Sequence, residues 1–417
     1  MSKSVNSASI ESCRVCGSSI TPVLSLGSIG HTGYFPSTPN EEFIEGPLDL
    51  VCCTNADCNL VQLGCNYDLN ALYGSHYGYL SSLNSSMVSH LKSKVDKLSN
   101  LVDINNGDII CDIGSNDGTT LNSYHFNNAR YVGFDPSAEK LRDLYLSGRD
   151  LVADFFSKEL FCSHFGTQDK AKIVTSFSMF YDLPDPVQFA CDVSSILDPE
   201  VGVWCFEQSY LPFMLQTNSF DTICHEHLEY YGLKQINYIL EKADLRIIDV
   251  EFNSINGGSI SITACKSSCK VYPNPISTIK SLIDSEVLSG YDSLDVYKRF
   301  LLRITSARDD LKDIVNRAKH KGLVVCGLGA STKGNTLLQY FDLDNTQITA
   351  IGEVNAEKFG KYTPSTNIPI IEEDKVLEIG DIFIVLPWHF KDNFLSIEKF
   401  KGKKLLFPLP YCHIVSL

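Results

Sequence analysis

The chain has 417 residues, more than one hydrophobic core usually covers, so we expect two or three domains. Hydrophobic residues make up 44% and charged residues 20%, as in ordinary globular proteins, and the net charge of −15 argues against a nucleic-acid-binding surface. No apolar run reaches the roughly 18–20 residues of a membrane span, and residues 1–12 lack a signal-peptide core. We therefore expect a cytoplasmic protein without membrane contact.

The fifteen cysteines cannot be assumed to form disulfides in a reducing compartment. Cys13 and Cys16 form a C-x-x-C-G turn that points two thiolates at one position, and Cys53 and Cys58 supply a second pair, with Cys52 as an alternative to Cys53. Four thiolates make a closed tetrahedral zinc site, and the Gly- and Pro-rich segment between the pairs lacks a core of its own. We predict a structural zinc ion. Free buried cysteines or a redox C-x-x-C are the alternatives.

Residues 108–118 carry a nucleotide-binding signal. An apolar run predicts a buried parallel strand, and it breaks into the loop Gly114-Ser115-Asn116-Asp117-Gly118, whose two glycines allow a close approach to a ligand. A second strand over residues 131–134 ends in Asp135, where a nucleotide-binding βαβ unit holds a ribose diol. The spacing is not G-x-G-x-x-G, so it favours S-adenosylmethionine over a dinucleotide. The alternative is an ordinary strand-turn-helix.

Strands continue to alternate with helix-sized spacers, at residues 151–156, 173–178 and 201–207, which predicts an α/β fold with a doubly wound parallel sheet. Ligands bind such sheets at the carboxyl ends of the strands. The polar residues that we expect at this edge are Asp112, Asp135, Asp154, Ser176, Ser178 and Glu207. With Gly114, Ser115, Asn116, Gly118 and Phe155 they form the predicted cofactor site, except Glu207, which we assign to the substrate.

His225, Glu226 and His227 are the densest group of ionisable side chains. Consecutive residues of a helix diverge by about 100°, so the three cannot all face one partner. A general base with an orienting carboxylate fits best, because imidazole accepts a proton near neutral pH. A polar surface turn is the alternative, and a metal site lacks an obvious third ligand.

Two further segments are candidates for pocket walls. Tyr77 and Tyr79 fall on one side of an extended chain in a hydroxyl-rich stretch, which is equally compatible with a surface loop. Residues 255–259, which include Asn256 and Ser259, join two strand-like runs by a tight turn near a ligand.

A second Rossmann-like pattern follows a mostly helical connector over residues 276–320. Predicted strands at 323–326, 348–352 and 382–386 surround a glycine-rich loop at 327–335, where backbone N–H groups, Ser331 and Lys333 suit a phosphate. The last strand runs into Trp388 and His389. Alone, this segment suggests a dinucleotide enzyme.

Together these motifs resemble the sugar-nucleotide C-methyltransferases of deoxysugar biosynthesis, over nearly the whole chain. The resemblance includes the four cysteines, C-N-L-V-Q-L at 58–63, Tyr77-x-Tyr79, I-G-S-N-D-G at 113–118, D-T-I-x-H-E-H at 221–227, N-G-G-S at 256–259 and the C-terminal glycine-rich loop. The family usually has tyrosine before His-Glu-His, and this chain has Cys224. That departure leaves the identity of the substrate open.

The resemblance implies a zinc-binding module (1–72), a methyltransferase domain (73–270) and a C-terminal Rossmann-like domain for the sugar nucleotide (271–417). It implies S-adenosylmethionine and structural zinc as cofactors, and a monomer or weak homo-oligomer. The expected reaction methylates C3 of a 4-keto-6-deoxy sugar linked to dTDP or GDP.

The same resemblance implies roles for individual residues. His227 is the base that forms an enolate, Glu226 orients it or binds a hydroxyl, and Tyr77, Tyr79 and His225 border the sugar. The expected substrate contacts are Glu207, Cys224, Asn256, Ser259, Ser331, Lys333, Trp388 and His389, of which Trp388 is equally a core residue.

Three other functions remain open from the sequence. An O-methyltransferase would use the same first loop, and an NAD(P)-dependent oxidoreductase would use residues 327–334. A zinc-ribbon adaptor without enzymatic activity would leave both Rossmann-like segments unexplained.

Overall fold

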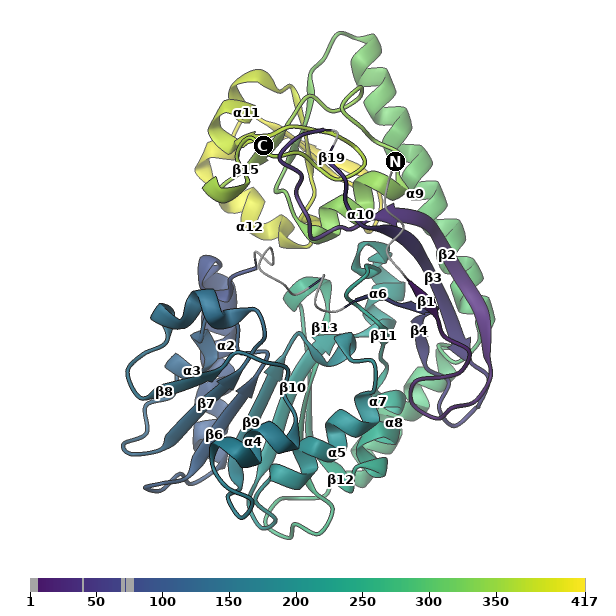
Figure 1. Cartoon of the computed structure of the whole chain (residues 1–417). Coiled ribbons are helices and arrows are strands. Elements are labelled where there is room, and N and C mark those ends of the chain that lie inside the picture. Colours follow the sequence, from purple (N-terminus) through teal and green to yellow (C-terminus); the bar gives the residue numbers. More distant parts are fainter. Residues whose placement is uncertain (1–6, 40, 69–71, 73–78, 417) are drawn as a thin grey trace.

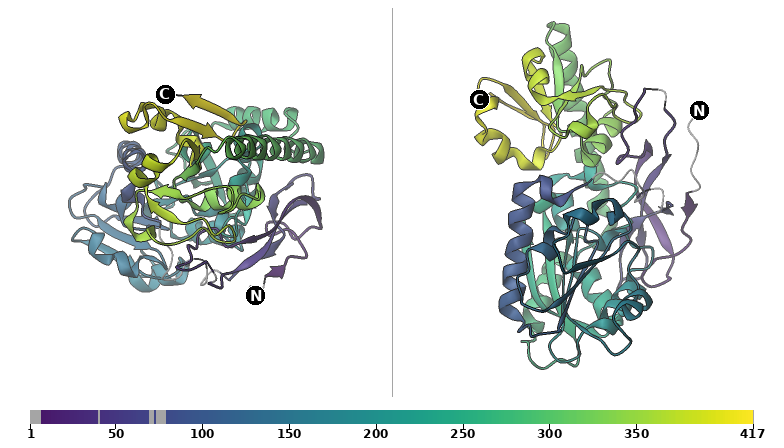
Figure 2. Two further views of the ribbon diagram at one scale, coloured as in Figure 1. Left: turned by 90° about the horizontal axis from the view of Figure 1, so that it is seen from above. Right: turned by 60° about the vertical axis from the view of Figure 1, so that its left-hand side comes forward.

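The computed structural model describes residues 7–39, 41–68, 72 and 79–416 (Figure 1). Two α/β lobes lie one above the other, and a purple N-terminal sheet runs along one side of their junction (Figures 1 and 2). The predicted α/β fold class is confirmed. Within the described part of the chain, no helix is both long and apolar enough to cross a membrane.

The lower lobe contains a seven-stranded sheet made of β6 (Ile109–Ile113), β7 (Arg130–Phe134), β8 (Arg149–Val152), β9 (Ala171–Phe177), β10 (Val203–Ser209), β12 (Leu245–Asn253) and β13 (Ser259–Lys266). Its strand order is β12-β13-β10-β9-β6-β7-β8. The strands from β10 to β8 are parallel, whereas β13 is antiparallel to both of its neighbours. The order reverses between β6 and β9, so the carboxyl ends of these strands are the expected place for a ligand.

Helices cover both faces of this sheet. They are α2 (Ser85–Leu101), α3 (Thr119–Asn122), α4 (Lys158–His164), α5 (Pro186–Ile196) and α7 (Leu233–Lys242). α6 (Leu211–Thr217) instead buries its apolar residues in the cluster shared with the upper lobe. Alternate residues of β6 enter two different cores: Ile109 and Cys111 pack on the side of α5 and α7, and Ile110 packs on the side of α2. A strand buried on both faces explains why β6 is apolar along almost its whole length.

The lower lobe also contains short 3₁₀ turns, of which η2 (Ala138–Leu144), η3 (Phe180–Asp182) and η5 (Ile255–Gly257) follow strands of the sheet, whereas η1 (Ser81–Leu83) precedes α2 and η4 (Phe220–Thr222) follows α6. The predicted strand at 151–156 is wrong in its second half. β8 ends at Val152 because the chain turns there, and the Asp154 N–H group donates a 2.9 Å hydrogen bond to the Val152 carbonyl. Asp154 and Phe155 therefore lie beyond the sheet.

The upper lobe contains a six-stranded sheet of β14 (Val325–Leu328), β15 (Ile351–Glu353), β16 (Ile370–Glu372), β17 (Ile382–Val385), β18 (Lys404–Phe407) and β19 (His413–Ser416). The order is β16-β15-β14-β17-β18-β19, parallel except for β19. The helices of this lobe are α10 (Thr332–Tyr340), α11 (Glu373–Ile379) and α12 (Lys391–Ser396), with turns η6 (Ala356–Lys358), η7 (Trp388–Phe390) and η8 (Glu398–Phe400). Two helices lead into it: α8 (Ile276–Leu288) packs against α7 of the lower lobe, and α9 (Leu294–His320) packs against β14 of the upper lobe. The helical connector is thus confirmed as α8 and α9.

The N-terminal sheet recruits a strand from the middle of the chain. It consists of β2 (Ile20–Gly30), β3 (Glu45–Cys53), β4 (Val61–Leu63) and β11 (Glu229–Tyr230), in the order β11-β4-β3-β2, beside a separate pair of β1 (Ala8–Ser9) and β5 (Cys65–Asn66). All neighbours are antiparallel, and β4 pairs Gln62 with Glu229 and Val61 with Tyr230. Since β11 follows residues 225–227, the sheet holds that segment from one side.

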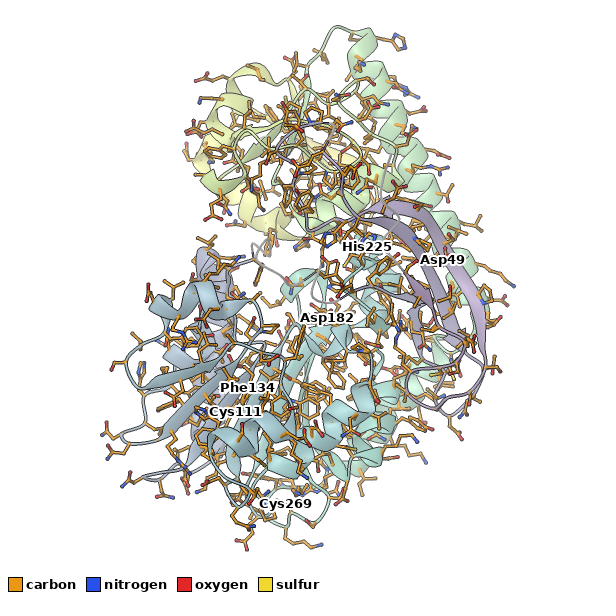
Figure 3. All side chains as sticks on the ribbon, in the orientation of Figure 1. Asp49, Cys111, Phe134, Asp182, His225 and Cys269 are labelled. Atoms are coloured by element: carbon orange, nitrogen blue, oxygen red, sulfur yellow. The ribbon has the colours of Figure 1, made fainter. Side chains whose placement is uncertain are left out.

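The N-terminal sheet also shares its cores with both lobes. Leu24 and Leu50 belong to the same apolar cluster as Phe300 and Ile304 of α9, whereas the cysteines at 13, 53 and 58 pack with the lower lobe. Figure 3 shows His225 at the junction of these parts, far from Cys111 and Phe134 in the lower sheet. The domain limits at 72/73 and 270/271 stay a prediction.

Candidate functional site

The four predicted zinc ligands form one cluster. The Sγ–Sγ distances are 3.7 Å for Cys13–Cys58 and 3.4 Å for Cys16–Cys53, and all four sulfur atoms lie within 4.8 Å of one another. Sulfur atoms about 2.3 Å from a tetrahedral zinc ion are separated by about 3.8 Å, so the cluster fits this metal. Cys52 points to the opposite side of β3, where its thiol lies 3.2 Å from Oδ1 of Asn59. The cluster therefore uses Cys53.

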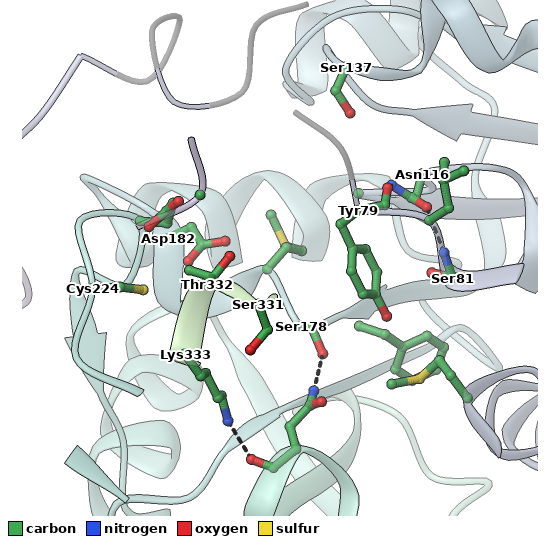
Figure 4. A pocket seen from close by; sticks show the side chains of 18 of the residues that line it. Tyr79, Ser81, Asn116, Ser137, Ser178, Asp182, Cys224, Ser331, Thr332 and Lys333 are labelled. Atoms are coloured by element: carbon green, nitrogen blue, oxygen red, sulfur yellow. Dashed lines mark hydrogen bonds between the residues drawn. The ribbon is translucent and has the colours of Figure 1, made fainter. Parts of the chain in front are cut away.

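A cavity of about 790 Å³ lies between the carboxyl ends of the lower sheet and the upper lobe (Figure 4). This volume is within the usual range for small-molecule sites. Its walls include thirteen of the residues that the sequence singled out: Tyr79, Gly114, Asn116, Asp135, Phe155, Ser178, Cys224, Glu226, His227, Asn256, Ser331, Lys333 and His389. Tyr77 lies outside the described residues.

The loop after β6 is shaped by Asp135 at the end of β7. One carboxylate oxygen of Asp135 accepts a 2.8 Å hydrogen bond from the Asn116 N–H group, and the other accepts hydrogen bonds from the N–H and hydroxyl groups of Ser137. Gly114 and Gly118 have φ values of +71° and +77°, a region that glycine adopts without steric cost. Asp135, Asn116 and Gly114 thus meet at one edge of the cavity.

Several predicted cofactor residues support the loop from behind. The Asp112 carboxylate accepts a 2.5 Å hydrogen bond from the Thr175 hydroxyl, and burial raises the pKa of Asp112 to about 7. The hydroxyl of Ser115 lies 2.8 Å from that of Tyr145, and Gly118 packs against the same tyrosine ring. None of the three predicted residues lines the cavity.

The remaining predicted cofactor residues divide between core, surface and cavity. Ser176 accepts a 2.9 Å hydrogen bond from the Trp204 indole in the core, and Asp154 is exposed beyond the sheet. Phe155 and Ser178 line the cavity. Ser178 has a φ of +55° and its hydroxyl lies 3.5 Å from Nδ2 of Asn256 (Figure 4).

Residues 225–227 lie in a bend between η4 and β11, where His225 and Glu226 are buried and His227 is half-buried, so the alternative of a surface turn is wrong. Their side chains diverge. The Nε2–H group of His225 donates to the Ile29 carbonyl at 3.0 Å in the N-terminal sheet, away from the cavity, whereas Glu226 and His227 line it. The three side chains therefore do not all contact one ligand, which agrees with the expectation that consecutive side chains diverge.

His227 has a defined tautomer. Its Nδ1 lies 2.7 Å from the Thr222 carbonyl, which only accepts, so Nδ1 carries the proton and Nε2 is the acceptor nitrogen. Burial lowers the pKa of His227 to about 4; the Glu226 carboxylate opposes this shift and the Lys333 ammonium adds to it. At neutral pH the imidazole is uncharged and able to take a proton.

Glu226 is held by a residue that the sequence did not single out. Its Oε1 lies 3.1 Å from Nε2 of His31, which comes directly after β2. Burial alone would raise the pKa of Glu226, but the charge of His31 and its hydrogen bond outweigh burial and hold this pKa below its usual value. His31 lies in a segment without apolar periodicity, which hid it from sequence analysis.

The upper lobe closes the cavity with Lys333 of α10. Its ammonium donates a 2.6 Å hydrogen bond to the Asn256 carbonyl in η5, and so connects the two lobes (Figure 4). Burial lowers the pKa of Lys333 and Asp221 opposes the shift. Nearby, burial and the charge of Lys333 lower the pKa of His389 to about 3.

Three predicted substrate residues lie behind the walls. Glu207 is buried between His90 at 2.6 Å, Lys94 at 3.3 Å and the Asn253 amide. The Ser259 hydroxyl donates to the Ile255 carbonyl at 2.9 Å. Trp388 donates from its indole to Asp221 at 2.9 Å and is a core residue, the alternative that the sequence left open.

Several cavity residues were not predicted from sequence: Gly33, Phe35, Tyr181, Glu353, Lys358 and Lys361. Glu353 ends β15 and accepts a 2.8 Å hydrogen bond from the Ala330 N–H group. Lys358 donates to the Ala330 carbonyl at 2.7 Å and lies 4.6 Å from the centre of the Phe35 ring. An acidic residue at the end of the second strand of a Rossmann-like unit predicts a nucleotide contact. This signal led to the prediction of Asp135 and would also have identified Glu353.

Three family models match consecutive parts of the chain. A "zinc binding domain" covers residues 13–73, a "Methyltransferase domain" covers 85–250, and a "C-methyltransferase C-terminal domain" covers 254–410. The chain is also similar to the C-methyltransferase NovU of Streptomyces niveus, with 28% identity over 414 residues, which are 98% of this chain and 97% of the relative.

Solved structures resemble part of the chain. The magnesium protoporphyrin IX methyltransferase ChlM of Synechocystis PCC 6803, with bound S-adenosylmethionine, covers 48% of this chain and 89% of its own, at 15% identity and a TM-score of 0.31. An S-adenosylmethionine-dependent methyltransferase of Clostridium acetobutylicum ATCC 824 covers 43% and 90%, at 16% identity and a TM-score of 0.31.

The three family models follow one another along the chain, the NovU relative matches it almost from end to end, and the four-cysteine cluster is formed. These findings support the C-methyltransferase family that the motifs indicate, with S-adenosylmethionine as methyl donor and a zinc-binding N-terminal domain.

Proposed function

We propose that the protein transfers a methyl group to C3 of a nucleotide-linked 4-keto-6-deoxy sugar, with His227 as the general base. The observation that carries this proposal is the fixed tautomer of His227 on the cavity wall. Its Nδ1–H group is engaged by the Thr222 carbonyl, which leaves Nε2 to accept a proton.

Carbon methylation needs a carbon nucleophile. S-adenosylmethionine, when bound, would supply an electrophilic methyl group, whose bond to sulfur breaks as the new C–C bond forms so that S-adenosylhomocysteine leaves. A ketone at C4 acidifies the C3–H bond, so proton transfer to Nε2 of His227 gives an enolate whose C3 forms the new C–C bond. Lys333 supplies buried positive charge near His227, which favours negative charge on the developing oxyanion.

The methyl donor fits the edge of the cavity formed by the lower sheet. Asp135 lies where a ribose diol is held in nucleotide-binding βαβ units, and the Asn116 and Gly114 loop brings backbone close to the same space. Phe155 and Ser178 extend this wall towards Asn256. This placement supports the assignment of these residues to S-adenosylmethionine.

The sugar nucleotide fits the opposite wall. Lys358 and Lys361 line the cavity there, and α10 begins directly after Ser331, whose hydroxyl accepts a 3.1 Å hydrogen bond from the Gly334 N–H group. Lysine ammonium groups and a helix N-terminus both favour a diphosphate. Lys333 lies near His227, where we place the sugar, so we assign the diphosphate to Lys358 and Lys361 and the sugar to the region beside His227 and Cys224.

The test is the position of the new methyl group. The protein is incubated with S-adenosylmethionine carrying a ¹³C-labelled methyl group and with dTDP- or GDP-linked 4-keto-6-deoxy sugars, and the product is examined by carbon–proton correlation NMR. A methyl carbon bonded to C3 is expected. A methyl bonded to oxygen would make the protein an O-methyltransferase, and hydride exchange with an added nicotinamide cofactor would favour the oxidoreductase.

A further inference from the structure

The N-terminal sheet places one side chain against Glu226, a residue of the cavity wall. His31 follows β2 and reaches Glu226 with an Nε2–Oε1 distance of 3.1 Å. Both side chains are only 8% exposed. The contact joins residues 195 positions apart, so it exists only because the N-terminal sheet packs at the junction of the two lobes (Figure 1).

The backbone around His31 is fixed from several sides. The N–H group of Gly30 donates to the Gln339 side chain at 2.7 Å, and the Gln339 amide returns a 3.1 Å hydrogen bond to the Gly30 carbonyl. The Asn335 amide donates to the Thr32 carbonyl at 2.6 Å. Both partners lie on α10, the helix that also carries Lys333, so the position of His31 is set by the upper lobe.

The two oxygens of Glu226 have different surroundings. Oε1 is engaged by His31, whereas Oε2 is buried and has no hydrogen-bond partner within the described part of the chain. A Cβ atom on Gly33 would come within 2.8 Å of Oε1, so a larger residue at this position would displace the carboxylate from its present place. A buried carboxylate oxygen without a partner is costly, and Glu226 lines the cavity.

We propose that His31 is a positioning residue: it fixes Oε1 of Glu226 so that Oε2 accepts a hydrogen bond from a hydroxyl group of the methyl acceptor, beside the base His227. This inference rests on the proposed function for the identity of the acceptor. It gives the N-terminal sheet a direct part in the geometry of the active site, in addition to its zinc cluster.

Two substitutions separate positioning from simple packing. In His31→Gln the side-chain amide can reach the place of Nε2 and still donate to Glu226, whereas in His31→Asn the donor is too short. We expect kcat of His31→Asn to fall by about 10–100-fold, as when an outer partner of a site ligand is removed, and His31→Gln to recover most of it. The KM for S-adenosylmethionine should stay unchanged in both.

The pH profile supplies a second readout. Because His31 holds the pKa of Glu226 down, His31→Asn should raise that pKa. Protonated Glu226 can no longer accept hydrogen bonds through both oxygens. When the pH is lowered, the activity of His31→Asn should therefore begin to fall at a higher pH than the activity of the wild type. His90→Gln is the matched control, because His90 forms a largely buried pair with Glu207 and neither residue lines the cavity. It should leave the pH profile and kcat unchanged.

The outcomes distinguish this inference from the proposed function. The His31 variants are compared with the wild type on whichever acceptor the wild type methylates. If the wild type methylates an oxygen atom, the proposed function is overturned, but the comparison of the His31 variants still tests the role of His31. Wild-type kcat in His31→Asn, or equal losses in His31→Asn and His31→Gln, would overturn the positioning role. Melting temperatures can be measured without a substrate. If the decrease in the His31→Ala/Glu226→Ala double variant equals the sum of the decreases in the two single variants, the two side chains do not interact.

Discussion

The carboxylates of Asp135 and Glu353 occupy equivalent places in the two lobes. Asp135 follows β7 and Glu353 ends β15, and each accepts a 2.8 Å hydrogen bond from a backbone N–H group, of Asn116 and Ala330 respectively, in the loop after the preceding strand. Both residues line the same cavity. One cavity thus has two loops of the same kind, which fits the proposed reaction between an adenosyl methyl donor and a nucleotide-linked sugar.

Asp135 and Glu353 should therefore affect different ligands. Asp135→Ala is expected to weaken S-adenosylmethionine binding by about 1.5–3 kcal/mol, because it removes hydrogen bonds to a charged group. Glu353→Ala, the matched control in the other lobe, should leave that affinity unchanged and weaken the sugar nucleotide instead. Calorimetric titration of each variant measures both affinities. Equal S-adenosylmethionine affinity in Asp135→Ala and the wild type would reassign the cofactor site.

Lys333 should control the protonation of His227. The pKa of His227 is about 4, so kcat/KM should stay constant as the pH falls from 7 and decrease only when the imidazole takes up a proton near pH 4. Lys333→Gln keeps a donor for the Asn256 carbonyl but removes the charge that lowers this pKa, so the decrease should begin at a higher pH.

Lys361→Gln is the control for this effect, because Lys361 lines the cavity but is not among the groups that shift the pKa of His227. In Lys361→Gln, kcat/KM should decrease at the same acidic pH as in the wild type. If the decrease moves to a higher pH by the same amount in both lysine variants, it depends on the general charge of the cavity and not on His227.

The zinc cluster gives a prediction with an adjacent control. Cys53→Ser removes a ligand and should lower the zinc content per chain, whereas Cys52→Ser should keep it, because the Cys52 thiol faces Asn59. Elemental analysis of protein purified without chelator measures both. Zinc retained in Cys53→Ser and lost in Cys52→Ser would reverse the assignment of the ligand.

Removal of zinc should also disturb the active site. β4 pairs with β11 directly after residues 225–227, and the Leu63 N–H group donates to the Leu228 carbonyl at 2.7 Å. Chelation should therefore reduce turnover before it weakens S-adenosylmethionine binding, since Asp135 lies in the other sheet. A fall in cofactor affinity that precedes the loss of turnover would contradict this order.

Features that depend on a short stretch of sequence could be predicted from the sequence. The strand at β6, its glycine loop and Asp135 lie within 27 residues, and the cysteine pairs are defined by short spacing, so both could be predicted. The end of β8 at Val152 could not, because the turn depends on a backbone hydrogen bond from Asp154 that no side-chain pattern reveals.

Features that depend on distant contacts were missed for a physical reason. The pairing of β11 with β4 and the contact of His31 with Glu226 join segments more than 160 residues apart, and neither carries periodicity. His225 was predicted to border the sugar, but the neighbouring N-terminal sheet offers the Ile29 carbonyl, and its side chain points there. Where adjacent histidines point is decided by packing and not by sequence.

The central claim is that His227 removes the C3 proton. His227→Asn keeps a polar side chain but cannot accept a proton at neutral pH, so turnover should fall by about 10²–10⁴-fold while both substrates still bind. His225→Asn is the control, because His225 lies outside the cavity.

The most direct measurement is exchange of the C3 proton with deuterated solvent, followed by NMR on the 4-keto sugar nucleotide in the presence of S-adenosylhomocysteine and without a methyl donor. Exchange is expected with the wild type and with His225→Asn, and it should stop with His227→Asn. Exchange that continues in His227→Asn at the wild-type rate would contradict the account and show that another group is the base.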